Sequence, residues 1–260
     1  LKRCLGIDYE IDYENSIITM NQYDHVVKML RAFNMEDCKA ESHPMPRNVT
    51  LSEATVPTDP DEIDKYKKQF NMERALGYFN WIAGGTRPDI CLALKHLSRF
   101  AKAYGPEHIA AAKHLMRYLK GTARKCLIYR AGMEPRMQVF TDASHAGCPD
   151  TGRSITGVVI KFAGCTIFWL CLYQKIVSHS SCESELMALD KGATTGRFVR
   201  WLLEAMGAKR SKPTNIFVDN QGTIDIAVNP VQAGRNKHVH ARYFYVRDLV
   251  KNGEYVIVHL

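Results

Sequence analysis

The stretch MQVFTDAS, residues 137–144, decides the expected fold of the second half of the chain. Apolar and polar side chains alternate along it, and a carboxylate, Asp142, follows the apolar run, as in a β-strand with one buried face. Two more runs rich in β-forming residues follow, ITGVVIKF at 155–162 and CTIFWLCL at 165–172, and Gly-containing turns separate the three runs. The pattern predicts an antiparallel three-stranded meander.

A long helix is predicted after the meander, over residues 180–207, with Ser180 or Ser181 as its N-cap. Its apolar residues recur at broadly helical spacing and are expected to face the core: Leu186, Leu189, Ala193, Phe198, Trp201, Leu202 and Met206. Further segments then alternate between strand and helix patterns, with strands at 215–221 and 254–260 and helical stretches at 223–229 and 240–253. This order predicts a mixed α/β sheet.

The sequence pattern of the first half of the chain predicts a β-hairpin followed by helices. Residues 4–20 alternate apolar and polar positions on both sides of the turn YENS, which is typical of a hairpin. Asn21 is expected to cap a helix that presents four apolar residues along one face: Val26, Val27, Leu30 and Phe33.

Prolines and acidic residues interrupt any periodic pattern from residue 41 to about residue 64, which predicts an exposed loop. Two helices are predicted after it, at 89–104 and 106–119, and their inward faces are expected to hold Leu94, Leu97, Ala101, Ile109, Ala112 and Met116. Pro106 suits the first turn of the second helix, and Gly121 is its expected terminator.

Composition favours a globular chain with a polyanionic partner. The 260 residues are 46% hydrophobic, enough for sizeable cores, and the formal net charge is +8. Between Cys91 and Arg130, Glu107 is the only carboxylate among nine Lys and Arg residues. We predict that this stretch binds nucleic acid, and a solvated cationic face is the alternative. The side chains concerned are Lys95, Arg99, Lys102, Lys113, Arg117, Lys120, Arg124 and Lys125.

The eight cysteines form no C-x-x-C pair and have no histidine partner at zinc-ligand spacing. They are therefore expected to be reduced thiols of an intracellular protein, in the cytoplasm or the nucleus. No signal peptide and no apolar run of about 18 residues occurs, so neither secretion nor a membrane span is expected.

Two aspartates come directly after apolar runs and are expected to end their strands, Asp142 the first strand of the meander and Asp219 the strand that follows the long helix. An aspartate at a strand end is usually a turn or cap residue when it stands alone. If the two strands are neighbours, however, both carboxylates emerge at one edge of the sheet, and a glutamate near the start of the helix can point between them. Hydrolysis of a phosphodiester by two Mg²⁺ or Mn²⁺ ions needs such oxygen ligands to converge on a pair of metal sites about 4 Å apart.

The same residues lie in motifs that resemble a known family. The C-terminal half resembles ribonuclease H domains, and the whole chain resembles the end of a copia-type retrotransposon Pol polyprotein. The motifs in the C-terminal half are FTDASHAG, SSCESELMAL, VDNQGTIDIAVNP and KHVHARYFYVRDLVKNGE. Upstream, LGIDYE, FNMEDCKAESHPM, LGYFNWIAGGTRPDI, LSRF and HLMRYLKGT resemble the segment that connects polymerase to nuclease.

The resemblance implies a thumb or connection region of reverse transcriptase over residues 1–132, mainly helical with a primer-grip-like hairpin, and a ribonuclease H-like domain over residues 133–260. It implies that Asp142, Glu185 and Asp219 hold two metal ions and cleave the RNA strand of an RNA/DNA hybrid. Glu183 is the alternate glutamate, and helix phase separates it from Glu185 by about 200°. Residues expected to touch the substrate backbone in the later basic helix are Lys237, His238 and Arg242.

The sequence also departs from the family's pattern. Ser144 and His145 replace an Asp-Trp pair that is frequent in relatives, LCLY precedes Gln174 where Ser and Lys are usual, and the KH-x-D pattern of the later helix reads KHVH. The chain ends before the helix that carries the family's fourth carboxylate, so the domain is expected to be truncated there. A Tyr-x-Asp-Asp polymerase turn is also absent, so an upstream polymerase domain of the same polyprotein is the expected partner.

Two other functions compete with a ribonuclease H. One is a catalytically inactive remnant of a Pol polyprotein that binds nucleic acid through the cationic stretch. The other is a nuclease of the integrase or transposase type, which would use Asp142, Asp219 and Glu254 in that order. A helix is the expected location of that third carboxylate, whereas Glu254 lies in a turn that leads into a strand.

Overall fold

A computed structural model of the chain describes residues 2–47, 49–208, 212–228 and 240–260, with side chains of the last segment described from residue 244. Its backbone divides into two compact units, Leu1–Ala131 and Gly132–Leu260. Each unit has a hydrophobic core of its own.

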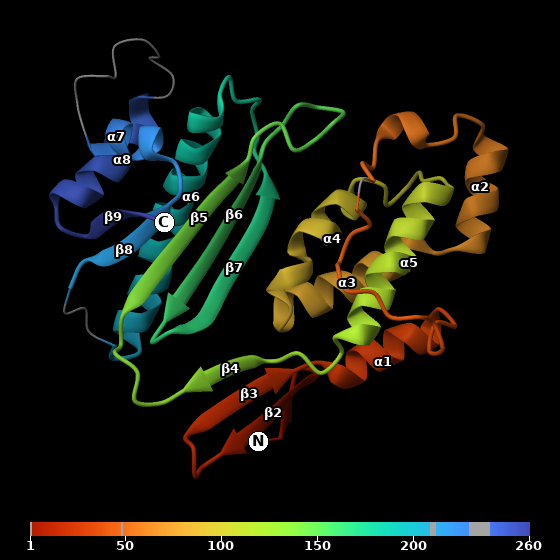
Figure 1. The fold of residues 1–260 in the computed structure, drawn as a ribbon, viewed down its shortest axis with the longest axis horizontal. Helices are drawn as coiled ribbons and strands as arrows, with labels where there is room; N and C mark the ends of the chain where they lie inside the picture. The colour runs from red at the N-terminus through yellow and green to blue at the C-terminus, as the bar shows by residue number, and fades with distance from the viewer. Residues whose placement is uncertain (1, 48, 209–211, 229–239) are drawn as a thin grey trace. The chain divides into compact units, whose positions relative to one another are not determined.

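The predicted meander is present in the second unit (Figure 1). It consists of β5 (Met137–Ser144), β6 (Ile155–Phe162) and β7 (Cys165–Tyr173), paired antiparallel. Two more strands, β8 (Thr214–Val218) and β9 (Tyr255–His259), extend the sheet on the other side of β5, each parallel to its neighbour. The strand order is therefore β7-β6-β5-β8-β9, and the mixed α/β sheet is confirmed.

The long helix α6 (Ser181–Ala205) lies against β5 at close range, and Ser180 caps it, since its side chain accepts from the backbone N–H of Glu183. Two glycines permit this approach. A Cβ at Gly192 would overlap Thr141 Cγ2, and a Cβ at Gly196 would lie 2.9 Å from Val139 Cγ2. The helices α7 (Gln221–Val228) and α8 (His240–Lys251) pack with α6 and with each other.

The prediction of which α6 residues face the core is correct only for the first half of the helix. Leu186, Leu189 and Ala193 are buried, but three residues of the second half, Phe198, Trp201 and Leu202, are exposed, and so is the C-cap residue Met206. The reason is that Gly192 and Gly196 face the sheet, where they allow close contact with β5. Residues of the second half on the same side of the helix as these glycines are therefore the ones that face inward. Val199 and the Arg200 side chain are buried instead.

The first unit contains the predicted hairpin, formed by β2 (Ile7–Asp12) and β3 (Ile17–Asn21). It belongs to a larger sheet that the sequence did not indicate, of order β1-β2-β3-β4, with β1 at Arg3–Cys4 and β4 at Leu127–Arg130. The strand β4 pairs antiparallel with β3 across more than a hundred residues of chain. Local periodicity cannot show such a pairing, because it depends on the tertiary structure.

The helices of this unit are α1 (Tyr23–Ala32), α2 (Pro60–Gln69), α3 (Met72–Gly85), α4 (Cys91–Ser98) and α5 (Pro106–Gly121), with 3₁₀ turns at Glu53–Thr55 and Pro88–Ile90. The prediction of a loop over residues 41–64 is wrong for its last part, where α2 begins at Pro60. Asp59 caps α2 by accepting from Asp61 N, and Pro60 opens the helix, so the acidic cluster starts a helix.

Smaller differences concern α1 and α4. Gln22 occupies the N-cap position of α1 without a side-chain capping hydrogen bond, and Asn21 Oδ1 accepts from Tyr23 N at 3.1 Å, so Asn21 caps the helix from one residue earlier. Met29 is buried, while Val27 and Phe33 are half-buried. The helix expected to reach residue 104 ends at Ser98. Within the described residues, no helix is both long enough and apolar enough to span a membrane.

Candidate metal centre

Three carboxylates from separate segments of the second unit converge at one end of the sheet, near the C-terminal ends of the inner strands β5 and β8. Asp142 lies in β5, Glu185 in the second turn of α6, and Asp219 directly after β8. One carboxylate oxygen from each lies within 4.8 Å of the others. The parallel pairing of Phe140 with Phe217 places Asp142 and Asp219, two residues further along each chain, at the same level.

The structure brings Glu185 into this cluster and leaves Glu183 outside it. Glu185 is 6% exposed, and its Oε1 accepts a hydrogen bond from Ala143 N at 3.1 Å. The Glu183 carboxylate instead accepts from His179 N at 2.7 Å, at the positive end of the helix dipole. The strand β5 runs two residues past Asp142, to Ser144, so Asp142 does not end it as the sequence suggested.

Burial and the nearby carboxylates both disfavour negative charge on Glu185 and Asp142. Burial raises the pKa of Glu185 from 4.5 to about 7, and the charges of Asp219 and Asp142 add to the effect, while the Ala143 N–H opposes it. Burial and the nearby Asp219 also raise the pKa of Asp142. A cation placed among the three oxygens would reverse these shifts.

The donor set fits a hard divalent cation. All three ligand atoms are carboxylate oxygens, which Mg²⁺ and Mn²⁺ prefer. Glu185 Oε2 is buried and has no hydrogen-bond partner among the described residues. A buried carboxylate oxygen left without a partner is costly, and a metal ion is the ligand that would satisfy it here.

Several polar side chains that support the cluster were not predicted. Thr141 Oγ1 donates to Phe217 O at 3.2 Å and so ties β5 to β8. Buried Gln174 donates to Thr156 Oγ1 at 3.0 Å and to Ser184 O at 2.9 Å, which joins β6 to the first turn of α6. A polar residue inside an apolar run is the only sequence signal for such a role.

The departures from the family pattern at Ser144 and His145 lie just beyond the cluster. His145 is exposed, and its Nδ1 lies 3.2 Å from Ser178 Oγ, a buried hydroxyl that is 2.8 Å from Ser154 Oγ. This chain of contacts holds the loop after β5 to the segment that leads into α6.

Glu254 does not belong to the cluster, and this overturns the integrase-type alternative. It precedes β9, and the pairing of Thr214 with Tyr255 places it at the opposite end of the sheet from Asp219, about 20 Å away along the strand. Its carboxylate pairs there with Arg197 and Arg200, each at 3.3 Å.

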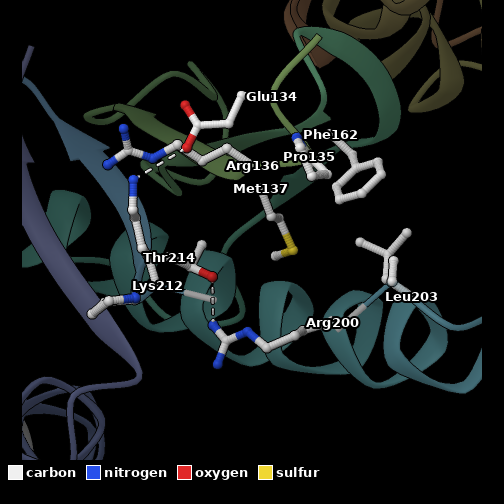
Figure 2. A pocket seen from close by; sticks show the side chains of 11 residues that line it. Glu134, Pro135, Arg136, Met137, Phe162, Arg200, Leu203, Lys212 and Thr214 are labelled. Carbon is white, nitrogen blue, oxygen red and sulfur yellow. Dashed lines mark hydrogen bonds and ion pairs between the residues drawn. The ribbon is translucent and has the colours of Figure 1, made fainter. Parts of the chain in front are cut away.

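A pocket lies at that opposite end, between the start of β5 and the second half of α6 (Figure 2). Met137, Phe162 and Leu203 supply apolar walls, and Arg200 donates to Thr214 Oγ1 at 2.9 Å. The cavity measures about 40 Å³, enough for ordered water but not for a nucleotide.

The predicted cationic stretch of the first unit serves its own fold in part. Arg117 donates to Lys39 O at 2.7 Å and pairs with Glu41 at 2.6 Å, and Lys120 donates to Cys38 O at 2.6 Å. Others interact with aromatic rings: Arg99 with Phe100, Arg124 with Tyr23, and Lys125 with Tyr118. Lys102 and Lys113 are exposed and Lys95 is half-exposed, and nucleic-acid contact by this set stays a prediction.

Three residues predicted to touch the substrate cannot be placed. Lys237 and His238 lie outside the described residues, and so does the side chain of Arg242 within α8.

The order β7-β6-β5-β8-β9, with acidic side chains where β5 and β8 meet the start of α6, defines a ribonuclease H-like fold. No family model matches the chain. It is 32% identical over 252 residues to the retrovirus-related Pol polyprotein from transposon TNT 1-94 of Nicotiana tabacum, covering 96% of this chain and 18% of the relative. With the Pol polyprotein from transposon RE1 of Arabidopsis thaliana it shares 29% identity, covering 93% of this chain and 16% of the relative.

The curated homologues of the chain over most of its length are therefore retrovirus-related Pol polyproteins of copia-type transposons, and the chain spans less than a fifth of the length of these relatives. Among solved structures, ribonuclease H1 LC11, isolated from compost by a metagenomic approach, aligns with a TM-score of 0.36 and 16% identity, covering 49% of this chain and 85% of that one. The division into a reverse transcriptase part at 1–132 and a ribonuclease H-like part at 133–260 stays a prediction.

Proposed function

We propose that the second unit is a metal-dependent ribonuclease H that hydrolyses the RNA strand of an RNA/DNA hybrid during reverse transcription. The observation that carries the proposal is the convergence of three carboxylate oxygens within 4.8 Å, one of them from a buried glutamate with an unpartnered Oε2. A structural role alone would not favour three like charges at such close range.

Each carboxylate has a distinct part in the proposed reaction. Asp142 and Asp219 are exposed, so they would hold metal ions on the side of the cluster that a bound hybrid can reach. Glu185 closes the site from the helix side, and the Ala143 N–H fixes its orientation. When bound, two Mg²⁺ or Mn²⁺ ions supply an activated water and stabilise the leaving oxygen.

The partners proposed for this unit follow from the same family. A hybrid duplex is the proposed substrate, and an upstream polymerase domain of the same polyprotein is the proposed source of that hybrid. In the first unit, the exposed lysines Lys102 and Lys113 are candidates for contact with a nucleic-acid backbone, where each neutralised phosphate adds to the salt dependence of binding.

The test is a cleavage assay with the full 260-residue chain, magnesium and a hybrid labelled separately on each strand. We expect cleavage of the RNA strand only, and loss of at least about 100-fold in rate for Asp142→Asn, because a neutral amide weakens the metal site. Glu183→Gln is the matched control, since that carboxylate caps α6 outside the cluster, and we expect it to cleave like the wild type.

Two outcomes would contradict the proposal. Cleavage that persists unchanged in Asp142→Asn would mean that the activity arises elsewhere. A wild-type chain that binds the hybrid with a steep salt dependence but never cuts it would favour the inactive, nucleic-acid-binding remnant.

A further inference from the structure

The three carboxylates are carried by three segments that must be held together against their mutual repulsion. Two of the connections are direct. The strand β5 is tied to β8 by their parallel pairing and by Thr141 Oγ1, which donates to Phe217 O at 3.2 Å. The same strand is tied to α6 by the hydrogen bond from Ala143 N to Glu185 Oε1 at 3.1 Å.

The third connection, between α6 and the turn that carries Asp219, passes through Thr223. This residue lies in the first turn of α7 and is fully buried. Its Oγ1 is 3.2 Å from Cys182 O and 3.5 Å from Cys182 Sγ, both in the first turn of α6. Its backbone N donates to Asn220 Oδ1 at 2.9 Å, which caps α7 immediately after Asp219.

We propose that the Thr223 hydroxyl is a positioning group that holds the Asp219 turn at metal-binding distance from Glu185. Cys182 is three residues before Glu185 on one side of this contact, and Asn220 is the neighbour of Asp219 on the other. The contact therefore completes a closed set of three links among the three ligand-bearing segments. This inference rests on the proposed metal-dependent function.

The Thr223 hydroxyl joins the Asp219 turn to α6, whereas other hydrogen bonds hold the turn to α7 and to the sheet. Ile224 N donates to Asn220 O at 3.2 Å, and Leu260 N donates to Val218 O at 3.0 Å. Asp219 is exposed, and Gly222, with no side chain, separates Gln221 from Thr223 in the first turn of α7. A preorganised site binds metal more tightly than one whose ligand must be drawn in at the moment of binding.

A purely structural role for the hydroxyl makes a different prediction. If Thr223 only stabilises the packing of α7 on α6, its loss lowers the melting temperature and leaves the affinity for metal unchanged. If it positions Asp219, the affinity for metal falls by a factor that the change in melting temperature does not explain.

The experiment compares Thr223→Val, which keeps the shape and removes the hydroxyl, with Thr223→Ser, which keeps the hydroxyl. Thr195→Val is the matched control, because it makes the same change at a buried threonine of α6 ten residues past Glu185. The readouts on the full chain are the Mg²⁺ concentration that gives half of the metal-induced rise in melting temperature, and the Mg²⁺ dependence of hybrid cleavage.

We expect Thr223→Val to raise the half-effect Mg²⁺ concentration about tenfold, with cleavage largely restored at saturating metal. Thr223→Ser and Thr195→Val should both stay close to the wild type in this concentration. If Thr223→Val fails to fold, the smaller Thr223→Ala carries the same expectation.

An unchanged Mg²⁺ requirement in Thr223→Val, with or without a lower melting temperature, would overturn the positioning role while leaving the nuclease proposal intact. A wild-type chain with no response to Mg²⁺ in either readout would overturn both. The wild-type response to Mg²⁺ therefore separates failure of the nuclease proposal from failure of the positioning role alone.

Discussion

At the scale of single residues, Glu185 is the group on which the metal centre depends most. It is the buried member of the cluster, one of its oxygens is held by Ala143 N, and the other has no partner among the described residues. Burial raises its pKa to about 7, so without metal it carries a proton near neutral pH. Metal binding must displace that proton, which couples the site to pH.

The sign of the pH dependence follows from this shift. Between pH 4.5 and about 7 the folded, metal-free chain keeps a proton on Glu185 that the unfolded chain has lost. Its stability therefore falls as pH rises through this window, by at most about 1.4 kcal/mol for each unit of the shift. Affinity for Mg²⁺ should change in the opposite direction, rising up to about pH 7 and then levelling.

Thermal unfolding of the metal-free chain from about pH 4 to about pH 8, repeated with Mg²⁺ titrations, measures both trends. Glu185→Gln should remove most of the slope in stability over this window. A variant that keeps the wild-type slope would show that another group is responsible.

At the scale of elements, α6 does two different things along its 25 residues. Its first half places Glu185 beside β5 and buries Leu186 and Leu189. Its approach to the sheet depends on Gly192, where a Cβ would overlap Thr141 Cγ2. Because Thr141 immediately precedes Asp142, the packing of this helix and the position of a ligand are mechanically linked.

We expect Gly192→Ala to lower the free energy of unfolding by about 1–3 kcal/mol, since overpacking outweighs the better helix propensity of alanine. Gly77→Ala is the control, because this glycine is exposed within α3 and nothing lies within 4 Å of the position that an alanine methyl group would take. That substitution should raise stability by about 0.5–1 kcal/mol. Urea denaturation of both variants checks the pair, and equal effects would contradict the packing argument.

At the scale of the whole molecule, the chain has two hydrophobic cores, and all three candidate ligands belong to the second unit. A ligand that binds only the folded state of a unit stabilises that unit by an amount set by its concentration relative to Kd. At about ten times Kd, the stabilisation is about 1.4 kcal/mol.

Hydrogen exchange of backbone amides can locate this stabilisation. We expect Mg²⁺ to slow exchange in β5, β8 and the first turns of α6, while α3 and α5 of the first unit serve as the internal reference. Equal protection of α3 and α5 would mean that metal binds elsewhere or that the two units open together.

Much of the fold followed from local patterns. The meander, the long helix and the last two strands were predictable because strand and helix periodicities are properties of neighbouring residues. The pairing of β4 with β3 and the exposed second half of α6 were not, because each depends on which residues a distant segment covers. The start of α2 at Pro60 was missed although its signal is local, since Asp59 caps the helix and Pro60 opens it.

The sequence by itself determined which carboxylates could form the centre, because Asp142 and Asp219 each follow an apolar run and Glu185 lies near a helix start. Only the tertiary structure decided that β5 and β8 are parallel neighbours and that Glu185, not Glu183, faces them. It also decided that Arg117 and Lys120 bind backbone carbonyls of their own unit. The physical reason is that a residue's type limits the contacts it can make, whereas long-range packing determines which of those contacts form.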